Sequence, residues 1–226
     1  MKNKYRSELK YEISVGEYFM LRPRLRQIMK SDPHADENGL YYVKSLYFDN
    51  CYDTALHEKL SGVNVRDKYR IRCYNDDYSL ILLEKKSKRN NLCLKKSCML
   101  SREECENLIN CGIFPENPEN ETLTEIRFGM TSRLMKPKTI VAYKREPYIF
   151  SAGNVRITFD SDIRTGLFNT DFFDGSNPLI PAQEAGKMIL EIKYDEFLPD
   201  IIRTAVQSGI PRLQAFSKYA ASRQYE

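Results

Sequence analysis

Charged side chains occupy every second position in several short segments of the sequence. In the segment around Lys10, Glu8 lies two residues earlier and therefore belongs to the same set of alternate positions. A later segment repeats the pattern with Lys68, Arg70 and Arg72. Guanidinium and ammonium groups bind phosphate oxygens, and a carboxylate among them suits a divalent cation that bridges phosphates. These residue types at this spacing indicate phosphoryl chemistry on a polyanionic substrate.

The same alternation recurs along the rest of the chain. Side chains of a strand point alternately to its two faces, so each segment predicts one charged face and one apolar face. Lys and Arg dominate the charged faces and carboxylates enter singly. This favours a charged lumen over the competing interpretation, the solvated face of an amphipathic sheet. We expect the following residues to point inward together: Arg6, Glu8, Lys10, Arg70, Arg72, Glu84, Lys86, Arg145, Arg156, Glu191 and Lys193.

An interior lined with cations needs groups that balance their charge. Buried unpaired cations lose their hydration without compensation, which is costly. Phosphates of a bound ligand would supply the missing charge, and a corridor of Arg and Lys suits a chain of phosphoryl groups. Glu8 and Glu191 would repel an anion, so a site that only binds anions does not explain them. They are suitable ligands for a divalent cation that also contacts phosphate oxygens.

The elements that must position these residues are mostly strands. Eight segments rich in β-branched and aromatic residues are typical strands, and eight suffice to close a barrel: residues 7–14, 43–49, 67–74, 79–88, 92–100, 139–148, 155–163 and 188–194. Apolar periodicity and capping residues predict helices over residues 15–30, 54–60, 101–109, 123–135, 199–208 and 217–225. We expect Pro23 to kink or break the first helix. The predicted fold class is α+β, an eight-stranded antiparallel β tunnel with flanking helices, built by a single domain over residues 1–226.

Composition narrows the function classes. The chain has 226 residues and a formal net charge of +4, too small a surplus to indicate nucleic-acid binding by itself. The basic residues alternate along strands instead of forming an exposed patch with stacking aromatics, so no nucleic-acid partner is expected. No apolar run approaches the ~18 residues of a membrane span, and six cysteines without a CxxC pair predict free thiols. We therefore expect a cytoplasmic protein.

Eight motifs of the sequence resemble, in the same order, those of the VTC domain, the catalytic module of polyphosphate polymerases. They are RSELKYEI, SLYFDN, KYRIRCY, LLEKKSK, AYKREPY, VRITFD, MILEIKYDEFLP and FSKYAASR. This domain belongs to the CYTH or triphosphate tunnel metalloenzyme superfamily. The resemblance covers nearly the whole chain. It implies an eight-stranded triphosphate tunnel that takes a nucleoside triphosphate and passes the growing polyphosphate along its bore.

The resemblance also implies roles for individual residues. Lys10 resembles the lysine that approaches the transferred phosphate, and Glu191 resembles the metal-binding glutamate, with Glu8 as a second candidate ligand for Mn²⁺ or Mg²⁺. The catalytic set implied is Lys10, Arg70, Arg72, Lys86, Arg145, Glu191 and Lys218. The substrate-binding set adds Lys96, for which Lys95 competes, and Tyr143, Arg156 and Lys193. Arg6 replaces the first carboxylate of the ExExK motif of hydrolytic relatives, which favours a single metal.

The resemblance implies an ATP-dependent polyphosphate polymerase, a metal-dependent phosphotransferase that moves the γ-phosphate of ATP onto a polyphosphate chain. Two alternatives stay open. The chain could be a triphosphate or tripolyphosphate hydrolase of the same superfamily, or a polyphosphate-binding subunit without catalysis of its own. ATP and polyphosphate are the expected partners, and any membrane helix that exports the product would belong to a partner protein.

Overall fold

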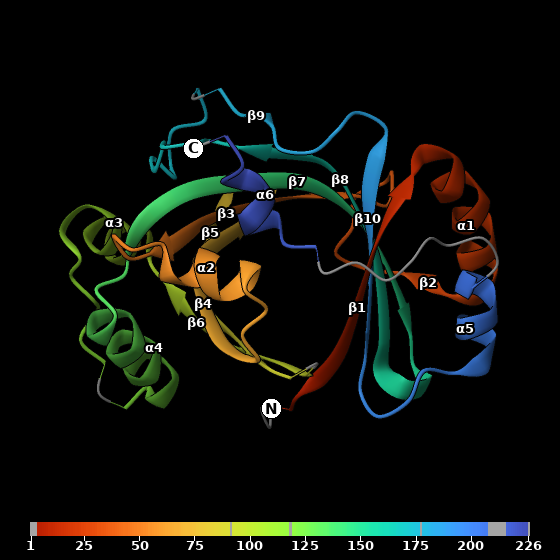
Figure 1. Cartoon of the computed structure of the whole chain (residues 1–226), viewed down its shortest axis with the longest axis horizontal. Coiled ribbons are helices and arrows are strands. Elements are labelled where there is room, and N and C mark those ends of the chain that lie inside the picture. The colour runs from red at the N-terminus through yellow and green to blue at the C-terminus, as the bar shows by residue number, and fades with distance from the viewer. Residues whose placement is uncertain (1–3, 91, 118, 177, 208–215, 226) are drawn as a thin grey trace.

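Eight long strands close into an antiparallel barrel (Figure 1), as expected from the sequence. The structure is a computed structural model that describes residues 4–90, 92–117, 119–176, 178–207 and 216–225. Around the barrel the order is β7, β3, β4, β5, β6, β1, β10, β8, and pairing of β8 with β7 closes the ring. The strands are β1 (Arg6–Ser14), β3 (Tyr41–Asp49), β4 (Val65–Tyr74), β5 (Asp77–Arg89), β6 (Leu92–Leu100), β7 (Lys136–Phe150), β8 (Val155–Thr165) and β10 (Lys187–Tyr194).

Two short strands extend this barrel. β2 (Lys30–Ser31) pairs with β7, and β9 (Ile180–Pro181) pairs with β8. Neither was predicted, because two residues are too few to show an alternation. A short 3-10 turn, η1 (Ala152–Asn154), connects β7 to β8.

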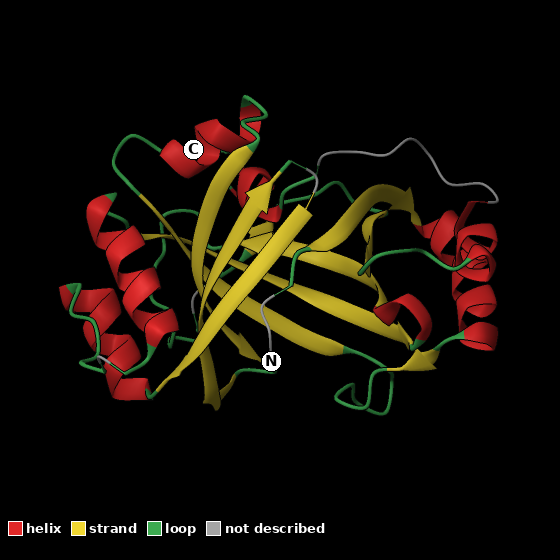
Figure 2. Ribbon diagram, turned by 90° about the horizontal axis from the view of Figure 1, so that it is seen from below, coloured by secondary structure: helices red, strands yellow, loops and turns green. Residues whose placement is uncertain are grey.

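Helices cover the outside of the barrel. They are α1 (Val15–Ile28), α2 (Thr54–Leu60), α3 (Arg102–Cys111), α4 (Glu121–Ser132), α5 (Asp200–Gln207) and α6 (Lys218–Ser222). Figures 1 and 2 agree in placing α1 and α5 on one side of the barrel and α3 and α4 on the other. The short helices α2 and α6 contact each other beside the barrel. None of the described helices has the length and apolar character that a bilayer span requires.

Most strands direct an apolar face outward to these helices, whereas a third apolar cluster, with Val43 and Val141, lies on the inward side together with Tyr143. Tyr69, Ile71 and Leu83 pack in one cluster with Leu108 of α3 and Ile126 of α4. A second cluster joins β1, β8 and β10 to α1 and α5. Burial of each large apolar side chain contributes roughly 1.5–3 kcal/mol, so the alternation fixes which face of the barrel is inside. The charged faces are thereby turned to the interior.

Local signals set most helix boundaries. Ser14 and Glu17 form a capping box at the start of α1, and Ser101 and Glu104 form the predicted one at α3. Pro23 lies inside α1, which runs unbroken to Ile28, so the helix does not break at this residue, and the kink that was the other expectation stays a prediction. Burial of Leu21 and Leu25 against the barrel offsets the roughly 3 kcal/mol cost of an internal proline. Ser208, the last residue of one predicted helix, lies outside the described residues.

Candidate functional site

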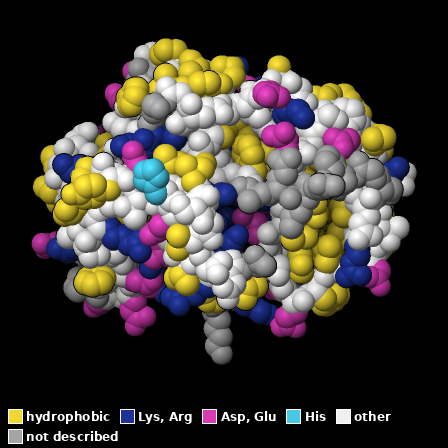
Figure 3. All heavy atoms as spheres, in the orientation of Figure 1, with side chains coloured by type: hydrophobic (Ala, Val, Ile, Leu, Met, Phe, Trp, Pro, Cys, Tyr) yellow, Lys and Arg dark blue, Asp and Glu magenta, His cyan; other side chains and the backbone are white. Residues whose placement is uncertain are grey.

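The interior of the barrel holds a cavity of about 490 Å³ with a strongly basic lining. Among the described residues that line it, eleven are Lys or Arg and two are carboxylates. Figure 3 shows basic and acidic side chains in the hollow near the centre of this face of the molecule. An excess of nine positive charges in a partly enclosed space is a strong attractor for polyanions.

Most residues predicted from the sequence meet in this cavity. Those that line it are Glu8, Lys10, Arg70, Arg72, Lys86, Tyr143, Arg145, Glu191, Lys193 and Lys218. They come from β1, β4, β5, β7, β10 and α6, so only the closed barrel brings them together. Eight of the residues expected to point inward therefore line the cavity, together with Tyr143 and Lys218, and their roles stay predictions.

Lys96 and Arg156 are not among the residues that line the cavity. Lys96 points to the outer face, where its Nζ contacts Glu125 of α4, because β6 directs the neighbouring Lys95 inward. Arg156 Nη2 lies 2.5 Å from Asp32 Oδ2, and Arg156 does not line the cavity. Lys96 is therefore directed away from the bore. Arg156 shares the inward face of β8 with Thr158, but its guanidinium contacts Asp32 and the hydroxyl of Tyr41 outside the lining of this cavity.

Arg6 also departs from its expected inward position. Its Nε lies 2.7 Å from Asp195 Oδ1, and its Nη2 donates to the carbonyl of Asn154. Arg6 is not among the residues that line the cavity. The arginine that replaces a carboxylate at this position thus ties the start of β1 to the end of β10 and to η1.

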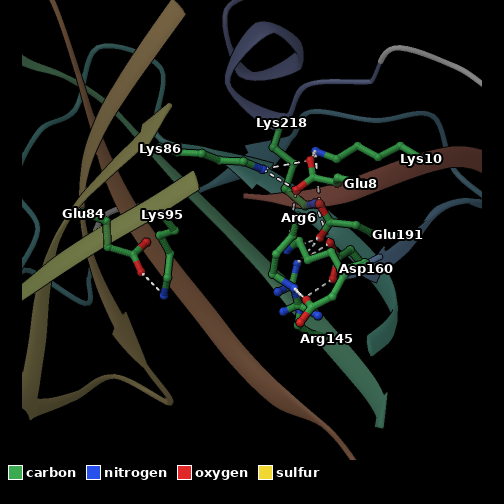
Figure 4. Close-up of polar contacts among 12 residues, drawn as sticks. Arg6, Glu8, Lys10, Glu84, Lys86, Lys95, Arg145, Asp160, Glu191 and Lys218 are labelled. Atoms are coloured by element: carbon green, nitrogen blue, oxygen red, sulfur yellow. Dashed lines mark hydrogen bonds and ion pairs between the residues drawn. The ribbon is translucent and has the colours of Figure 1, made fainter. Parts of the chain in front are cut away.

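Two carboxylates and one lysine form the centre of the site. Lys10 and Glu191 are cross-strand partners on β1 and β10, and so are Glu8 and Lys193. Lys10 Nζ lies 3.1 Å from Glu8 Oε1 and 3.3 Å from Glu191 Oε1. Lys86 reaches across from β5, with its Nζ 2.6 Å from Glu8 Oε2 (Figure 4).

The charges of this group stabilise one another. Burial and the neighbouring Glu191 oppose ionisation of Glu8, but the surrounding ammonium groups outweigh both and lower its pKa to about 2. Burial likewise opposes ionisation of Glu191, and Lys193 and Lys10 nevertheless hold its pKa well below the usual range. Burial would lower the pKa of Lys10, but the two carboxylates raise it. All three groups are charged at neutral pH.

Glu84 organises the two arginines on β4. Its carboxylate is fully buried and accepts from Arg70 Nε and Nη2, each at 2.7 Å. Lys95 Nζ lies 2.8 Å from the other oxygen, in a group separate from the Glu8 group in Figure 4. Arg72 Nη2 donates to the hydroxyl of Tyr143 at 3.1 Å. These contacts fix the guanidinium planes before any ligand arrives.

Asp160 plays the same part for β7 and α6, although it was not predicted as a site residue. Its carboxylate is fully buried and accepts from Arg145 Nε and Nη2 at 2.6 and 2.7 Å. Lys218 Nζ lies 2.5 Å from Asp160 Oδ2, so this contact docks α6 on the barrel. The signal that could have found Asp160 is its place on the charged face of β8, two residues beyond Thr158.

Lys68 was placed on the same charged face as Arg70 from the sequence, but it was not predicted as a site residue. Its Nζ donates to Ser217 Oγ at 3.0 Å and lies 5.2 Å from the centre of the Tyr219 ring. No carboxylate forms an ion pair with Lys68 within the described ranges. Burial first, and then the neighbouring cations Lys10 and Lys86, place its pKa well below the usual value of a lysine.

The site has few ligands for a metal ion. No cluster of three or more His, Cys, Asp or Glu residues suited to a metal occurs in the described part of the chain. Glu8 and Glu191 both contact Lys10, and the buried hydroxyl of Thr158, the cross-strand partner of Glu191, has no hydrogen-bond partner. Mg²⁺ is commonly held by one or two carboxylates together with substrate phosphates. The donor set fits a divalent ion that binds together with phosphate.

Comparisons with known proteins agree with this geometry. A family model of the VTC domain matches residues 5–225. A proposed adenylyl cyclase from Hippeastrum, described as having a dominant triphosphatase activity, is 15% identical with a TM-score of 0.53, over 98% of this chain and 96% of that one. A proposed adenylate cyclase from Bacillus halodurans is 14% identical with a TM-score of 0.52, over 92% of this chain and 89% of that one. The structural similarity confirms the CYTH-like tunnel fold. No curated protein matches the sequence.

Proposed function

The chain belongs to the VTC-domain family, and from this premise we propose that it is an ATP-dependent polyphosphate polymerase. It transfers the γ-phosphoryl group of ATP to the terminal phosphate of a polyphosphate chain. The observation that carries the proposal is the cavity with eleven basic residues and only two carboxylates in its described lining. Residues 1–226 form the proposed polymerase domain, and the proposed compartment is the cytoplasm, where ATP is available.

The proposed reaction needs charge more than acid–base chemistry. An oxygen of the terminal phosphate attacks the γ-phosphorus, the bond to the β,γ-bridging oxygen breaks, and ADP leaves with that electron pair. The nucleophile is already an oxyanion, so no strong general base is required. The protein must bring two anions together and screen their repulsion, which positioned cations do well.

Donor binding falls to the β4 and β5 side of the tunnel. Arg70 and Arg72 present guanidinium groups that Glu84 and Tyr143 hold in place, which suits bidentate contacts with phosphate oxygens. Lys86 adds a point charge between these arginines and the carboxylate pair. The three side chains would hold the triphosphate of ATP.

Acceptor binding falls to the opposite wall. Lys10 lies between the two lining carboxylates, and Arg145 and Lys218 converge on Asp160. Arg145 contacts Glu191 as well as Asp160, and a phosphate placed between Arg145 and Lys218 would add further negative charge to this group of buried cations. The predicted contribution of Arg156 to the acceptor is not retained, since this arginine is paired with Asp32 away from the cavity.

Glu191 and Glu8 are the proposed ligands of Mn²⁺ or Mg²⁺. A divalent ion bound there with phosphate would stabilise the charge that develops on the leaving oxygen. The contacts of Lys10 and Lys193 keep both carboxylates ionised and ready for such an ion.

The test is a turnover assay with ATP, Mn²⁺ or Mg²⁺ and a short polyphosphate primer, with products separated on a gel. A ladder of long chains together with ADP supports the polymerase. Release of orthophosphate alone would identify a hydrolase, an activity related to the one described for the Hippeastrum protein. Tight polyphosphate binding without turnover under either metal would identify a binding subunit.

A further inference from the structure

Lys218 reaches the tunnel from a helix that is too short to fix its own position. Helix α6 has five residues, and isolated helices shorter than about 12–15 residues are marginal in water. The contact between Lys218 and Asp160 acts at the tip of a long side chain (Figure 4). The place of the ammonium group therefore depends on what holds the rest of α6.

The next residue of α6, Tyr219, is held by two hydrogen bonds and a ring contact. It is buried, and its hydroxyl donates to Asp49 Oδ2 at 2.7 Å. The same hydroxyl accepts from Arg223 Nη1 at 2.9 Å, and the ring stacks on Tyr47 with the ring centres 5.2 Å apart. Burial, and then the hydrogen bond to Asp49, raise the pKa of Tyr219, so its hydroxyl remains a donor at neutral pH.

Asp49 serves two helices with one carboxylate. It is fully buried at the end of β3, and it accepts from the backbone N–H groups of Ala55 and Leu56 at 2.9 and 3.1 Å. These N–H groups belong to the first turn of α2 and have no partner within that helix. Asp49 therefore caps α2 and holds Tyr219 of α6 at the same time. The two helices contact each other beside the barrel (Figure 1).

The residue at the usual cap position of α2 contacts α6 instead. Asp53 has a left-handed backbone, with φ at 51°, and its side chain makes no capping hydrogen bond. Its two oxygens accept from Arg223, directly after α6, with Nη1 at 2.9 Å and Nη2 at 3.1 Å. Left-handed backbone costs free energy at residues other than glycine, and such residues cluster at functional sites. The conformation of Asp53 thus favours the contact with α6 over local capping.

We call Asp49, Asp53, Tyr219 and Arg223 the α6 anchor. Of these four, only Tyr219 is among the described residues that line the cavity. We propose that Asp49 and Arg223 are positioning residues, which act through Tyr219 to hold the Lys218 ammonium group where phosphate binds. An ammonium group that is fixed in advance loses less conformational freedom when the ligand arrives. The role of Lys218 as a phosphate contact rests on the proposed function.

The test is a double-mutant cycle read by tripolyphosphate binding to the full chain, without ATP or metal. Tyr219→Phe removes the hydroxyl that joins Asp49 to Arg223 but keeps the ring on Tyr47. We expect it to weaken tripolyphosphate binding about fivefold, because part of the contribution of Lys218 is lost. In a Lys218→Met background the same substitution should change the affinity by less than about twofold, because the group that it positions is absent.

Tyr148→Phe is the matched control. Tyr148 is as buried as Tyr219, and its hydroxyl donates to the buried Glu146 at 2.5 Å and accepts from Arg26 Nε at 3.2 Å. Neither Tyr148 nor Glu146 is among the described residues that line the cavity. This variant should lower the melting temperature about as much as Tyr219→Phe and leave the affinity for tripolyphosphate unchanged.

Two results would overturn the positioning role. One is an equal effect of Tyr219→Phe and Tyr148→Phe on affinity. The other is an equal loss from Tyr219→Phe with and without Lys218, which a purely structural role predicts. Asp49→Asn should show the same dependence on Lys218 as Tyr219→Phe, and Tyr219→Phe decides alone if that variant does not fold.

The binding assay separates this inference from the proposed activity. A wild type that binds tripolyphosphate through an anchored Lys218, but forms no polymer from ATP, would remove the polymerase and leave the positioning role. A wild type that forms polymer, with a Tyr219→Phe variant of unchanged affinity, would remove the positioning role and leave the polymerase.

Discussion

Lys86 on β5 and Glu8 on β1 form an ion pair across the weakest seam of the barrel. Their Nζ and Oε2 atoms lie 2.6 Å apart. The neighbouring strands β1 and β6 share only two residue pairs, whereas β1 and β10 share eight. The ion pair thus supports barrel closure with the same two groups that line the cavity, so we expect barrel closure and phosphate binding to be coupled.

We expect Lys86→Met to weaken both stability and phosphate binding. Loss of a partner for the buried Glu8 carboxylate should lower the free energy of unfolding by about 1–2 kcal/mol, less than for a fully buried pair because Lys86 is partly exposed. Urea denaturation and tripolyphosphate titration measure the two effects. Lys85→Met is the control, since Lys85 faces outward and pairs with Asp67 and Glu125. Equal loss of phosphate affinity in both variants would contradict the coupling.

Glu191→Gln should reduce metal-dependent turnover by about 100-fold or more, because a ligand at the developing charge is lost. Tripolyphosphate binding without metal should not weaken, since the substitution removes a negative charge from a cationic cavity. Initial rates across a Mn²⁺ titration measure the first effect. Glu12→Gln, on β1 but outside the cavity lining, should stay within twofold of the wild type (~0.4 kcal/mol). Full activity of Glu191→Gln would sink the metal assignment.

Asp160→Asn should destabilise the ligand-free protein, because Arg145 and Lys218 lose the carboxylate that both contact. Breaking a buried ion pair costs about 3 kcal/mol or more, and each kcal/mol lowers the melting temperature by roughly 2–4 °C at this chain length. Tripolyphosphate should restore more stability to this variant than to the wild type. Thermal unfolding with and without ligand tests this, with Asp162→Asn on the same strand as a control. A ligand effect no larger than in the wild type would argue against phosphate binding between Arg145 and Lys218.

The stability of the protein should depend on pH through Lys68. Its pKa in the folded state lies well below the 10.5 of a free lysine. Between these two values the folded state has lost the proton that the unfolded state still binds, so this residue makes stability rise with pH. The free energy of unfolding of Lys68→Met should therefore exceed that of the wild type at neutral pH, by an amount on the order of 1 kcal/mol. This gap between the two free energies should close as the pH rises toward 10.5.

Urea denaturation of both proteins over this pH range measures the gap. Saturating tripolyphosphate should abolish the gap, since bound phosphate stabilises the charged ammonium group. A gap independent of pH would mean that Lys68 acts through packing alone.

Sequence periodicity predicted the fold and most of the site for one physical reason. Apolar residues such as Ile71 and Leu190 must reach the helices, and this fixes the inward direction of Arg70 and Glu191. Periodicity shows to which face of a strand a side chain belongs, but it does not show which other side chain it contacts. It could not show that Asp160 would meet Lys218, because that contact depends on how α6 docks.

The remaining sequence prediction concerns the choice between Lys95 and Lys96. Lys96→Met should stay within twofold of wild-type turnover (~0.4 kcal/mol) and slightly destabilise α4, because the lysine contacts Glu125 on the outer face. Lys95→Met should raise the KM for ATP, since it removes a partner of the buried Glu84 that holds Arg70. Steady-state kinetics measure the turnover and the KM of both variants, and unfolding curves measure their stability. A larger kinetic defect in Lys96→Met than in Lys95→Met would return Lys96 to the tunnel and contradict the register of β5 with β6.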